Sequence, residues 1–335
     1  MHDKKKALRF LIYFSPLVLF AVSLYLGTFR IPLPDLAKTL LSPLVPAWKA
    51  GLPEGYASIV FAVRLPRIIL ALAVGSALSV SGAALQALFK NPLVNEYILG
   101  LSSGAGFGAS LSLVFLGPAF PPQISAFLFA VVAVLLVLSI SAKSESPIVS
   151  LLLTGVIVSA FFTALLSLVE FFASPYSLQA LFNWLMGNLA RPGWSDLAVS
   201  LPFVLGGVAV LVLLRWRLNV LSLSDEEARS LGVDLRKEKF LVIALATLIT
   251  AAATAVAGII GWIGLIVPHL VRMMAGADNR RVVPLSAALG ASFLLLADDI
   301  ARSLASFEVP VGIFTSIIGI PLFILLLRKS SQAWS

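Results

Sequence analysis

Long apolar runs separated by short polar segments follow one another along the whole chain. A helix needs about 20 apolar residues to cross the hydrocarbon core of a bilayer, with a range of about 17–25. The runs that reach or approach this length predict about ten helices, at about 10–29, 66–89, 97–116, 123–142, 148–171, 196–214, 240–258, 262–275, 283–298 and 309–327. We therefore expect an all-α, polytopic membrane protein whose residues 1–335 form a single transmembrane domain.

The division between the seventh and eighth predicted helices depends on glycine and proline. Residues 240–271 contain no Asp, Glu, Lys or Arg, so no charge marks a loop within them. Three glycines and a proline favour a break or a tilt instead. These residues are Gly258, Gly261, Gly264 and Pro268.

Basic residues predict the orientation of these helices. The first run follows Lys4, Lys5, Lys6 and Arg9 and ends without a small-residue cleavage site, so we interpret it as an uncleaved helix. Of the 24 Lys and Arg residues, 17 lie in one set of connecting segments and 7 in the other. Because cytoplasmic loops are enriched in Lys and Arg, both termini are predicted to be cytoplasmic, in a bacterial or archaeal cytoplasmic membrane.

Composition narrows the class of protein further. The chain is 59% hydrophobic and only 12% charged, which leaves too few charges to cover a water-exposed surface. The net charge of +8 raises nucleic-acid binding as an alternative, but the basic residues lie in short loops between apolar runs, as membrane topology requires. The absence of cysteine excludes disulfides, thiolate metal sites and cysteine nucleophiles.

Three connecting segments are long enough to carry structure of their own. Residues 30–63 form a predicted outside loop rich in proline, and residues 172–195 form a second outside loop that has room for a short surface helix. Residues 215–239 form the one sizeable polar segment on the cytoplasmic side. There, Ser224 can cap a short helix that Gly232 ends. Such a helix suits either a docking surface for a soluble partner or a plain connector.

Two groups of sequence motifs stand out, and together they cover about residues 60–330. The first group comprises Arg64-Leu65-Pro66-Arg67, Gly75, Ser81-Gly82-Ala83-Ala84-Leu85-Gln86, Asn91-Pro92-Leu93 and Gly100-Leu101-Ser102-Ser103-Gly104-Ala105. The second comprises Gly264-Leu265-Ile266-Val267-Pro268-His269-Leu270-Val271-Arg272, Ala297-Asp298, Ala301-Arg302 and Pro310-Val311-Gly312. In these motifs the chain resembles the permease subunits of the iron-siderophore, haem and cobalamin ABC importers.

The resemblance implies partners for this chain. It implies a dimer of two ten-helix permease subunits, most simply a homodimer. Two cytoplasmic ATP-binding subunits dock on this dimer from one side, and an extracytoplasmic substrate-binding protein docks from the other. This chain has no Gly-x-x-x-x-Gly-Lys-Ser/Thr run, so ATP and Mg²⁺ are expected on the partner, and we expect a transport subunit that is not itself an enzyme. No cofactor is expected on this chain.

The resemblance also implies roles for particular residues. Docking of the binding protein is expected at Arg64, Arg67 and Arg302. Coupling to the ATPase is expected at Ser224, Asp225, Glu226, Ala228, Arg229, Leu231 and Gly232. A cytoplasmic gate is expected at Asn91, Pro92, Leu93, Ser144, Glu145 and Ser146. The translocation path is expected along 148–171 and 309–327, with Thr154, Ser159, Thr163 and Ser167 on the first of these helices.

Each assignment has a simpler alternative. The outside arginines suit lipid headgroups, and Asn91-Pro92-Leu93 suits a turn that ends a helix. Asp298 and Asp299 suggest a proton relay, but an i,i+4 pair of Asp298 with Arg302 is simpler. His269 has no partner at ligand spacing, so we expect it to be packed and not to bind metal.

Three classes of function compete at this point. The first is the ABC importer permease, carrying an iron chelate, haem, cobalamin or an oxyanion such as molybdate. The second is a transporter driven by an ion gradient, which would favour paired acidic residues at the middle of the membrane. The third is an intramembrane enzyme, which would need a nucleophile–base pair or a metal cluster within the bilayer. The sequence favours the first class.

Overall fold

The computed structural model describes residues 2–27, 29–142, 144, 147–304 and 309–331, and the described residues are helical with no strand. Their α-helices are α1 His2–Tyr25, α2 Leu33–Leu41, α3 Tyr56–Ser58, α4 Leu65–Phe89, α5 Leu101–Leu111, α6 Pro122–Ser141, α7 Pro147–Phe172, α8 Pro175–Leu185, α9 Trp194–Leu213, α10 Arg215–Leu221, α11 Asp225–Ser230, α12 Leu235–Ala257, α13 Ile263–Ala275, α14 Asn279–Leu304 and α15 Val311–Ser331. Four further helical segments complete the set. Two are tighter 3-10 turns, η1 Pro46–Gly51 and η4 Gly117–Ala119, and two are wider π-helical turns, η2 Ile59–Arg64 and η3 Ser112–Leu116.

Each predicted apolar run corresponds to a helix, and the all-helical class is confirmed. Seven helices of the described chain are long and apolar enough to cross a membrane by length and composition. Three shorter apolar helices, Leu101–Leu116, Ile263–Ala275 and Val311–Leu326, match the remaining predicted runs. The predicted surface helix between the fifth and sixth runs is also present, as α8.

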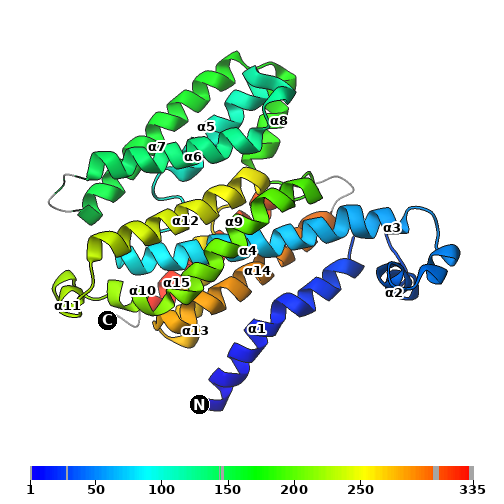
Figure 1. Cartoon of the computed structure of the whole chain (residues 1–335), viewed down its shortest axis with the longest axis horizontal. Helices are drawn as coiled ribbons and strands as arrows, with labels where there is room; N and C mark the ends of the chain where they lie inside the picture. The colour runs from blue at the N-terminus through cyan, green and yellow to red at the C-terminus, as the bar shows by residue number, and fades with distance from the viewer. Residues whose placement is uncertain (1, 28, 143, 145–146, 305–308, 332–335) are drawn as a thin grey trace.

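The helix α4 runs through the middle of the molecule (Figure 1). It contacts α14, α12, α13 and α9. Of the most apolar 18-residue stretch in the continuous helical span Tyr56–Phe89, 83% is buried. The helices α5, α6, α7 and α8 form a second group, which contacts the first through α12. One end of the bundle carries α10 and α11, and the other carries α2 and α3. We call them the α11 end and the α2 end.

Glycine allows the helices to approach closely where these groups meet. A Cβ atom on Gly75 of α4 would collide with the backbone of Gly290 in α14, and the reverse is also true. Gly104 and Gly108 lie one turn apart on α5, against the backbones of Phe129 and Ser125 in α6. Such small-residue contacts drive helix association in membranes, where hydrophobic burial between helices contributes little.

Two predicted boundaries are wrong. The first helix ends at Tyr25 and not at residue 29. The loop predicted at 30–63 ends near Gly55 and not at residue 63, because helical structure continues without interruption from Tyr56 into α4. The wide turn η2 lies just before Pro66 and opens the backbone there, so the proline sits at the start of α4 without breaking the helical path.

The break predicted between the seventh and eighth helices is confirmed. The helix α12 ends at Ala257, and Gly258 has a φ of +73°. Trp262 also has a positive φ, of +74°, which is uncommon for a bulky residue, and α13 begins at the next residue. The chain therefore crosses this region as a short irregular segment, 258–262, enclosed by other helices.

Candidate functional site

The polar segment 215–239 contains a compact element at the α11 end. The helix α11 begins as predicted, because the Ser224 side chain accepts a hydrogen bond from the Glu227 amide at 3.2 Å and the Glu227 carboxylate accepts one from the Ser224 amide at 2.9 Å. Gly232, with a φ of +76°, follows its end. This reciprocal capping stabilises a helix too short to persist on its own.

The predicted coupling residues divide into two sets. Glu226, Arg229 and Leu231 are exposed and form the surface of this element, to which Ser224 and Gly232 also contribute. Ala228 is fully buried and anchors the helix to the body of the protein. Contact with a partner is therefore open to the first set but not to Ala228.

Asp225 links α11 to two other parts of the chain. Its carboxylate accepts a hydrogen bond from Lys239 of α12 at 2.9 Å and one from Lys90, at the end of α4, at 3.1 Å. The hydrogen bond from Lys239 is the main cause that lowers the pKa of Asp225, and Lys90 adds to it. Lys90 directly precedes Asn91-Pro92-Leu93, so the predicted coupling element and the predicted gate are joined by one carboxylate.

The predicted gate motif forms a turn at the α11 end. Lys90 adopts the left-handed conformation that ends α4, and the Asn91 side chain accepts a hydrogen bond from the Leu93 amide at 2.9 Å. Pro92 and Leu93 are exposed. Among the other predicted gate residues, Ser144 follows α6 at the same end, whereas Glu145 and Ser146 lie outside the described residues.

The three predicted docking arginines lie together toward the α2 end, but all three are buried. Arg64 donates hydrogen bonds to the carbonyl oxygens of Leu24 and Phe29, and Arg302 donates one to that of Ser23 at 2.7 Å. The last carbonyl groups of α1 have no partner within the helix, and cations at a helix C-terminus are favourable. The two arginines therefore fasten the end of α1 to α4 and α14.

The predicted pairing of Asp298 with Arg302 is wrong. Asp298 accepts hydrogen bonds from Arg67 of α4, with the Arg67 Nη2 atom at 2.9 Å from Oδ1 and the Nε atom at 3.0 Å from Oδ2. Arg302 pairs instead with Asp299, whose carboxylate also accepts a hydrogen bond from the Ser23 hydroxyl at 2.5 Å. The reason is tertiary: the Gly75–Gly290 crossing brings α4 close to the acidic face of α14.

The helix α7 presents an open apolar face. Of the most apolar 18-residue stretch within Ile148–Phe172, only 22% is buried. The exposed side chains include Leu153, Val156, Ile157, Phe161, Leu168 and Phe171. Of the predicted path residues, Thr163 and Ser167 are exposed and Ser159 is half-buried, whereas Thr154 is buried against Ser141 of α6 and does not lie on this face.

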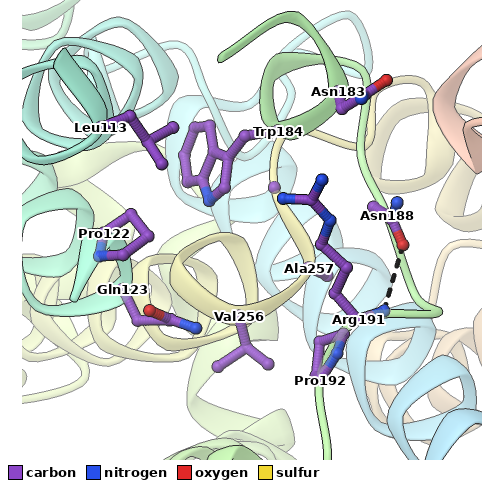
Figure 2. Close-up of a pocket in the computed structure, with 11 residues that line it drawn as sticks. Leu113, Pro122, Gln123, Asn183, Trp184, Asn188, Arg191, Pro192, Val256 and Ala257 are labelled. Carbon is purple, nitrogen blue, oxygen red and sulfur yellow. Dashed lines mark hydrogen bonds between the residues drawn. The ribbon is translucent and has the colours of Figure 1, made fainter. Parts of the chain in front are cut away.

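A pocket of about 140 Å³ lies between α6, α8 and the end of α12 (Figure 2). Leu113, Pro122, Pro192 and Val256 give it apolar walls, and Gln123, Asn183, Trp184, Asn188 and Arg191 give it polar groups. Arg191 is exposed, and Asn188 accepts a hydrogen bond from its amide at 3.3 Å. Sequence reasoning attached no role to this arginine.

No described group of three or more His, Cys, Asp and Glu side chains could hold a metal ion. His269 lies near the Phe323 ring of α15, with ring centroids 6.3 Å apart, which fits the predicted packed histidine.

The sequence analysis assigned no role to one buried acidic residue, Glu96. It is 2% exposed, and it follows the gate motif. Its signal in the sequence was an acid placed directly before an apolar run.

Comparisons with known proteins agree with one another. The chain matches the FecCD transport family over residues 15–329. It is 39% identical over 311 residues to the molybdate import system permease MolB of Haemophilus influenzae, covering 92% of this chain and 91% of that protein. It is 41% identical over 304 residues to the cobalamin import system permease BtuC of Halobacterium salinarum, covering 89% and 80% of the two chains.

Two further relatives extend this picture. The haemin transport permease HmuU of Yersinia pestis is 37% identical over 294 residues, covering 85% of this chain and 88% of that protein. A solved structure assigned to the metal-chelate type of ABC transporter, in an inward-facing conformation, superposes with a TM-score of 0.86 at 36% identity and covers 97% of this chain and 99% of that one. These relations confirm the resemblance found in the motifs, and the chain belongs to the FecCD transport family of ABC importer permeases.

Proposed function

We propose that this chain carries a metal chelate of the siderophore, haem or cobalamin class inward, with ATP hydrolysed by separate subunits. The observation that supports the chelate most directly is the open face of α7, which has hydroxyl groups but no basic side chain. A large chelate needs a passage that binds it weakly. A bare oxyanion such as molybdate, the second candidate because of MolB, would need charged or strong hydrogen-bond donors along the path.

A transport assay separates these two substrates. The permease, its ATPase and its binding protein would be reconstituted in vesicles and offered labelled ferric siderophore, haem, cobalamin and molybdate in parallel. We expect ATP-dependent uptake of one chelate and none of molybdate. Uptake of molybdate alone would contradict the chelate proposal. Uptake that follows an ion gradient without ATP would instead support the secondary-transporter alternative.

The proposed topology has ten membrane-spanning helices, made of the seven long and three short apolar ones. The α11 end is cytoplasmic in this proposal, together with the start of α1 and the end of α15, which lie toward that end (Figure 1). Since the chain has no cysteine, single introduced cysteines report cleanly. Ser224→Cys should react with an impermeant reagent only from the cytoplasmic side, and Tyr176→Cys only from outside. The reverse pattern would invert the orientation.

The proposed assembly is a homodimer in a bacterial or archaeal cytoplasmic membrane. Its axis lies along the open faces of α7 and α15, where apolar side chains are left exposed by the described residues. Thr163 and Ser167 would then line the path, with Ser159 at its edge. Crosslinking between two copies of Phe161→Cys, with Leu135→Cys of α6 as the control on another exposed face, tests this arrangement.

Asp225 supports a route from ATP hydrolysis to the gate. A nucleotide-driven subunit that moves the exposed surface of α11 would also move Asp225, and through Lys90 the Asn91-Pro92-Leu93 turn. Because the pairs are partly exposed, they can separate and re-form at little cost. Ala228→Pro would break α11, since proline inside a helix costs about 3 kcal/mol. We expect normal insertion of that variant but loss of assembly with the ATPase.

We also propose that the binding protein docks at the α2 end. Arg64, Arg67 and Arg302 are occupied by internal partners, so their contribution would be to hold the shape of this surface. Arg191 is exposed beside the pocket and is free to meet an acidic side chain. Arg191→Glu should slow association with the binding protein most strongly at low salt. Lys38→Glu, a reversal at another exposed residue of this end, is the matched control.

A further inference from the structure

The segment between α4 and α5 folds back into the protein after the gate motif. The Gln86 side-chain amide of α4 donates a hydrogen bond to the Val94 carbonyl at 3.1 Å. Three residues later, the Tyr97 hydroxyl donates one to the carbonyl of Ile260 at 3.2 Å. The segment 90–100 therefore reaches from the α11 end to the irregular segment 258–262 between α12 and α13.

Glu96 lies at the deepest part of this returning segment. Its Oε2 atom faces the Cα atom of Gly264, so closely that a side chain at that position would collide with it. Gly264 in turn packs against α4 at Leu78 and Gly82. With 3.6 residues per turn, these two residues lie about two to three turns from the Phe89 end of α4. The carboxyl group is thus held well inside the bundle.

No side chain of the described residues compensates a charge at this site. Neither carboxyl oxygen of Glu96 meets a side-chain donor among the described residues, and no described cation pairs with it. The polar groups that face the carboxyl group are the backbone amides of Glu96 and of Gly264, in the first turn of α13, and they offset only part of the cost of its burial. Arg272 of α13 donates hydrogen bonds to the Gln86 side chain and to the Ala83 carbonyl. The Tyr97 hydroxyl is bonded to Ile260, and the segment 258–262 contains no titratable side chain.

The remaining titratable residue of α13 is also engaged elsewhere. His269 packs beside Phe323 of α15. The residues of α4 that adjoin Gly264 carry no charge. A buried carboxylate with no cation beside it is costly enough that the group takes up a proton instead. Acidic residues at depth in a membrane protein are usually functional, which distinguishes Glu96 from an ordinary loop residue.

We propose that Glu96 is a proton-binding site, that its neutral form seats the segment 90–100 between α4 and α13, and that its ionisation releases this segment. The ligand is a proton and not a metal ion, because the Oε2 atom already lies against the backbone of Gly264. Its consequence for transport rests on the proposed function, since the segment carries the gate motif. The binding of a proton to Glu96 does not depend on the proposed function.

Two separate single-cysteine variants test the seating of the segment 90–100 without any transport measurement. Val94→Cys would place a thiol at a buried position of the segment, and Leu93→Cys would place one at the exposed neighbour. Each would be made with Glu96 and with Glu96→Gln, in the assembled complex. The labelling rate of Val94→Cys is divided by that of Leu93→Cys, so that the pH dependence caused by ionisation of the thiol itself cancels. Fully buried glutamates are known with pKa values of about 8–9. Below that range, the ratio should rise about tenfold per pH unit with Glu96 and stay constant with Glu96→Gln.

Infrared spectroscopy gives a second readout that needs no introduced cysteine and no labelling. We expect the carbonyl stretching band of a protonated carboxylic acid at neutral pH, lost as the pH rises through the same range and absent from Glu96→Gln. Equal labelling ratios in the two backgrounds at every pH would overturn the seating role. Absence of the protonated band, or labelling that depends on Na⁺ or K⁺ and not on pH, would overturn the proton site.

Discussion

The two ends of the molecule use charge in opposite ways. At the α2 end, Arg67 and Asp298 are buried and bonded to each other, and the neighbouring Arg64 and Arg302 are buried as well. At the α11 end, Lys90, Asp225 and Lys239 form a network whose side chains remain 17% to 45% exposed. Separating a buried pair leaves uncompensated charge, whereas separating an exposed one costs little. The first arrangement suits a fixed scaffold and the second a joint that moves.

The largest expected effect follows from breaking the buried pair. Arg67→Glu would place two carboxylates together, and removal of one partner of a buried pair alone costs about 3–5 kcal/mol. We expect poor yield and a much lower unfolding temperature in detergent. Arg191→Glu, at an exposed position of the same end, should change neither. Normal stability of Arg67→Glu would show that this end is not a scaffold, and would return Arg67 to a docking role.

A smaller effect on stability, but a large one on activity, is expected at the other end. Asp225→Asn removes the charge that joins Lys90 and Lys239, and exposed pairs contribute about 0–1 kcal/mol. The variant should therefore fold normally yet transport poorly for each ATP hydrolysed. Arg236→Gln is the control, since Arg236 is an exposed charged residue of the same polar segment and has no expected coupling role. Equal coupling ratios in the two variants would remove Asp225 from the proposed route.

The smallest expected effect concerns Asp278, which lies between α13 and α14 at the α11 end. Hydrogen bonds from Asn219 and then Arg280 lower the pKa of Asp278 to about 2. A lowered pKa stabilises the fold above about pH 4, and this stabilisation is lost as the pH falls toward 2. Asp278→Asn should therefore lower the free energy of unfolding slightly between pH 5 and 7, by about 1 kcal/mol at most, and should not change it at pH 2. A difference that grew on acidification would contradict this sign.

Local patterns predicted the parts of the structure that local chemistry governs. Ser224, the acidic turn after it and Gly232 together predicted α11, because capping depends on residues within one turn. Apolar runs of sufficient length predicted the membrane helices. Even the break at Gly258 could be predicted, although the left-handed backbone at Trp262 could not, since a bulky residue gives no signal for it.

Pairings between distant segments could not be predicted in the same way. Arg302 has Asp298 and Asp299 within one turn, and sequence spacing alone chose the wrong one. The choice depends on Arg67, 231 residues from Asp298, which reaches it only because α4 and α14 cross at two glycines. Glu96 was missed for a similar reason. Its burial results from a segment that folds back after a turn, and a turn motif does not reveal where the chain goes next.

The close contact of α5 with α6 has a mechanical consequence. Helices joined through glycine, with backbone against backbone, have little room to slide or rotate against each other. We therefore expect the contacts at Gly104 and Gly108 to make α5 and α6 move as one body, together with α7, which contacts both. If the molecule changes shape during a transport cycle, we expect this block to tilt as a unit. The flexing would then be confined to its few tethers, among them the segment that holds Glu96.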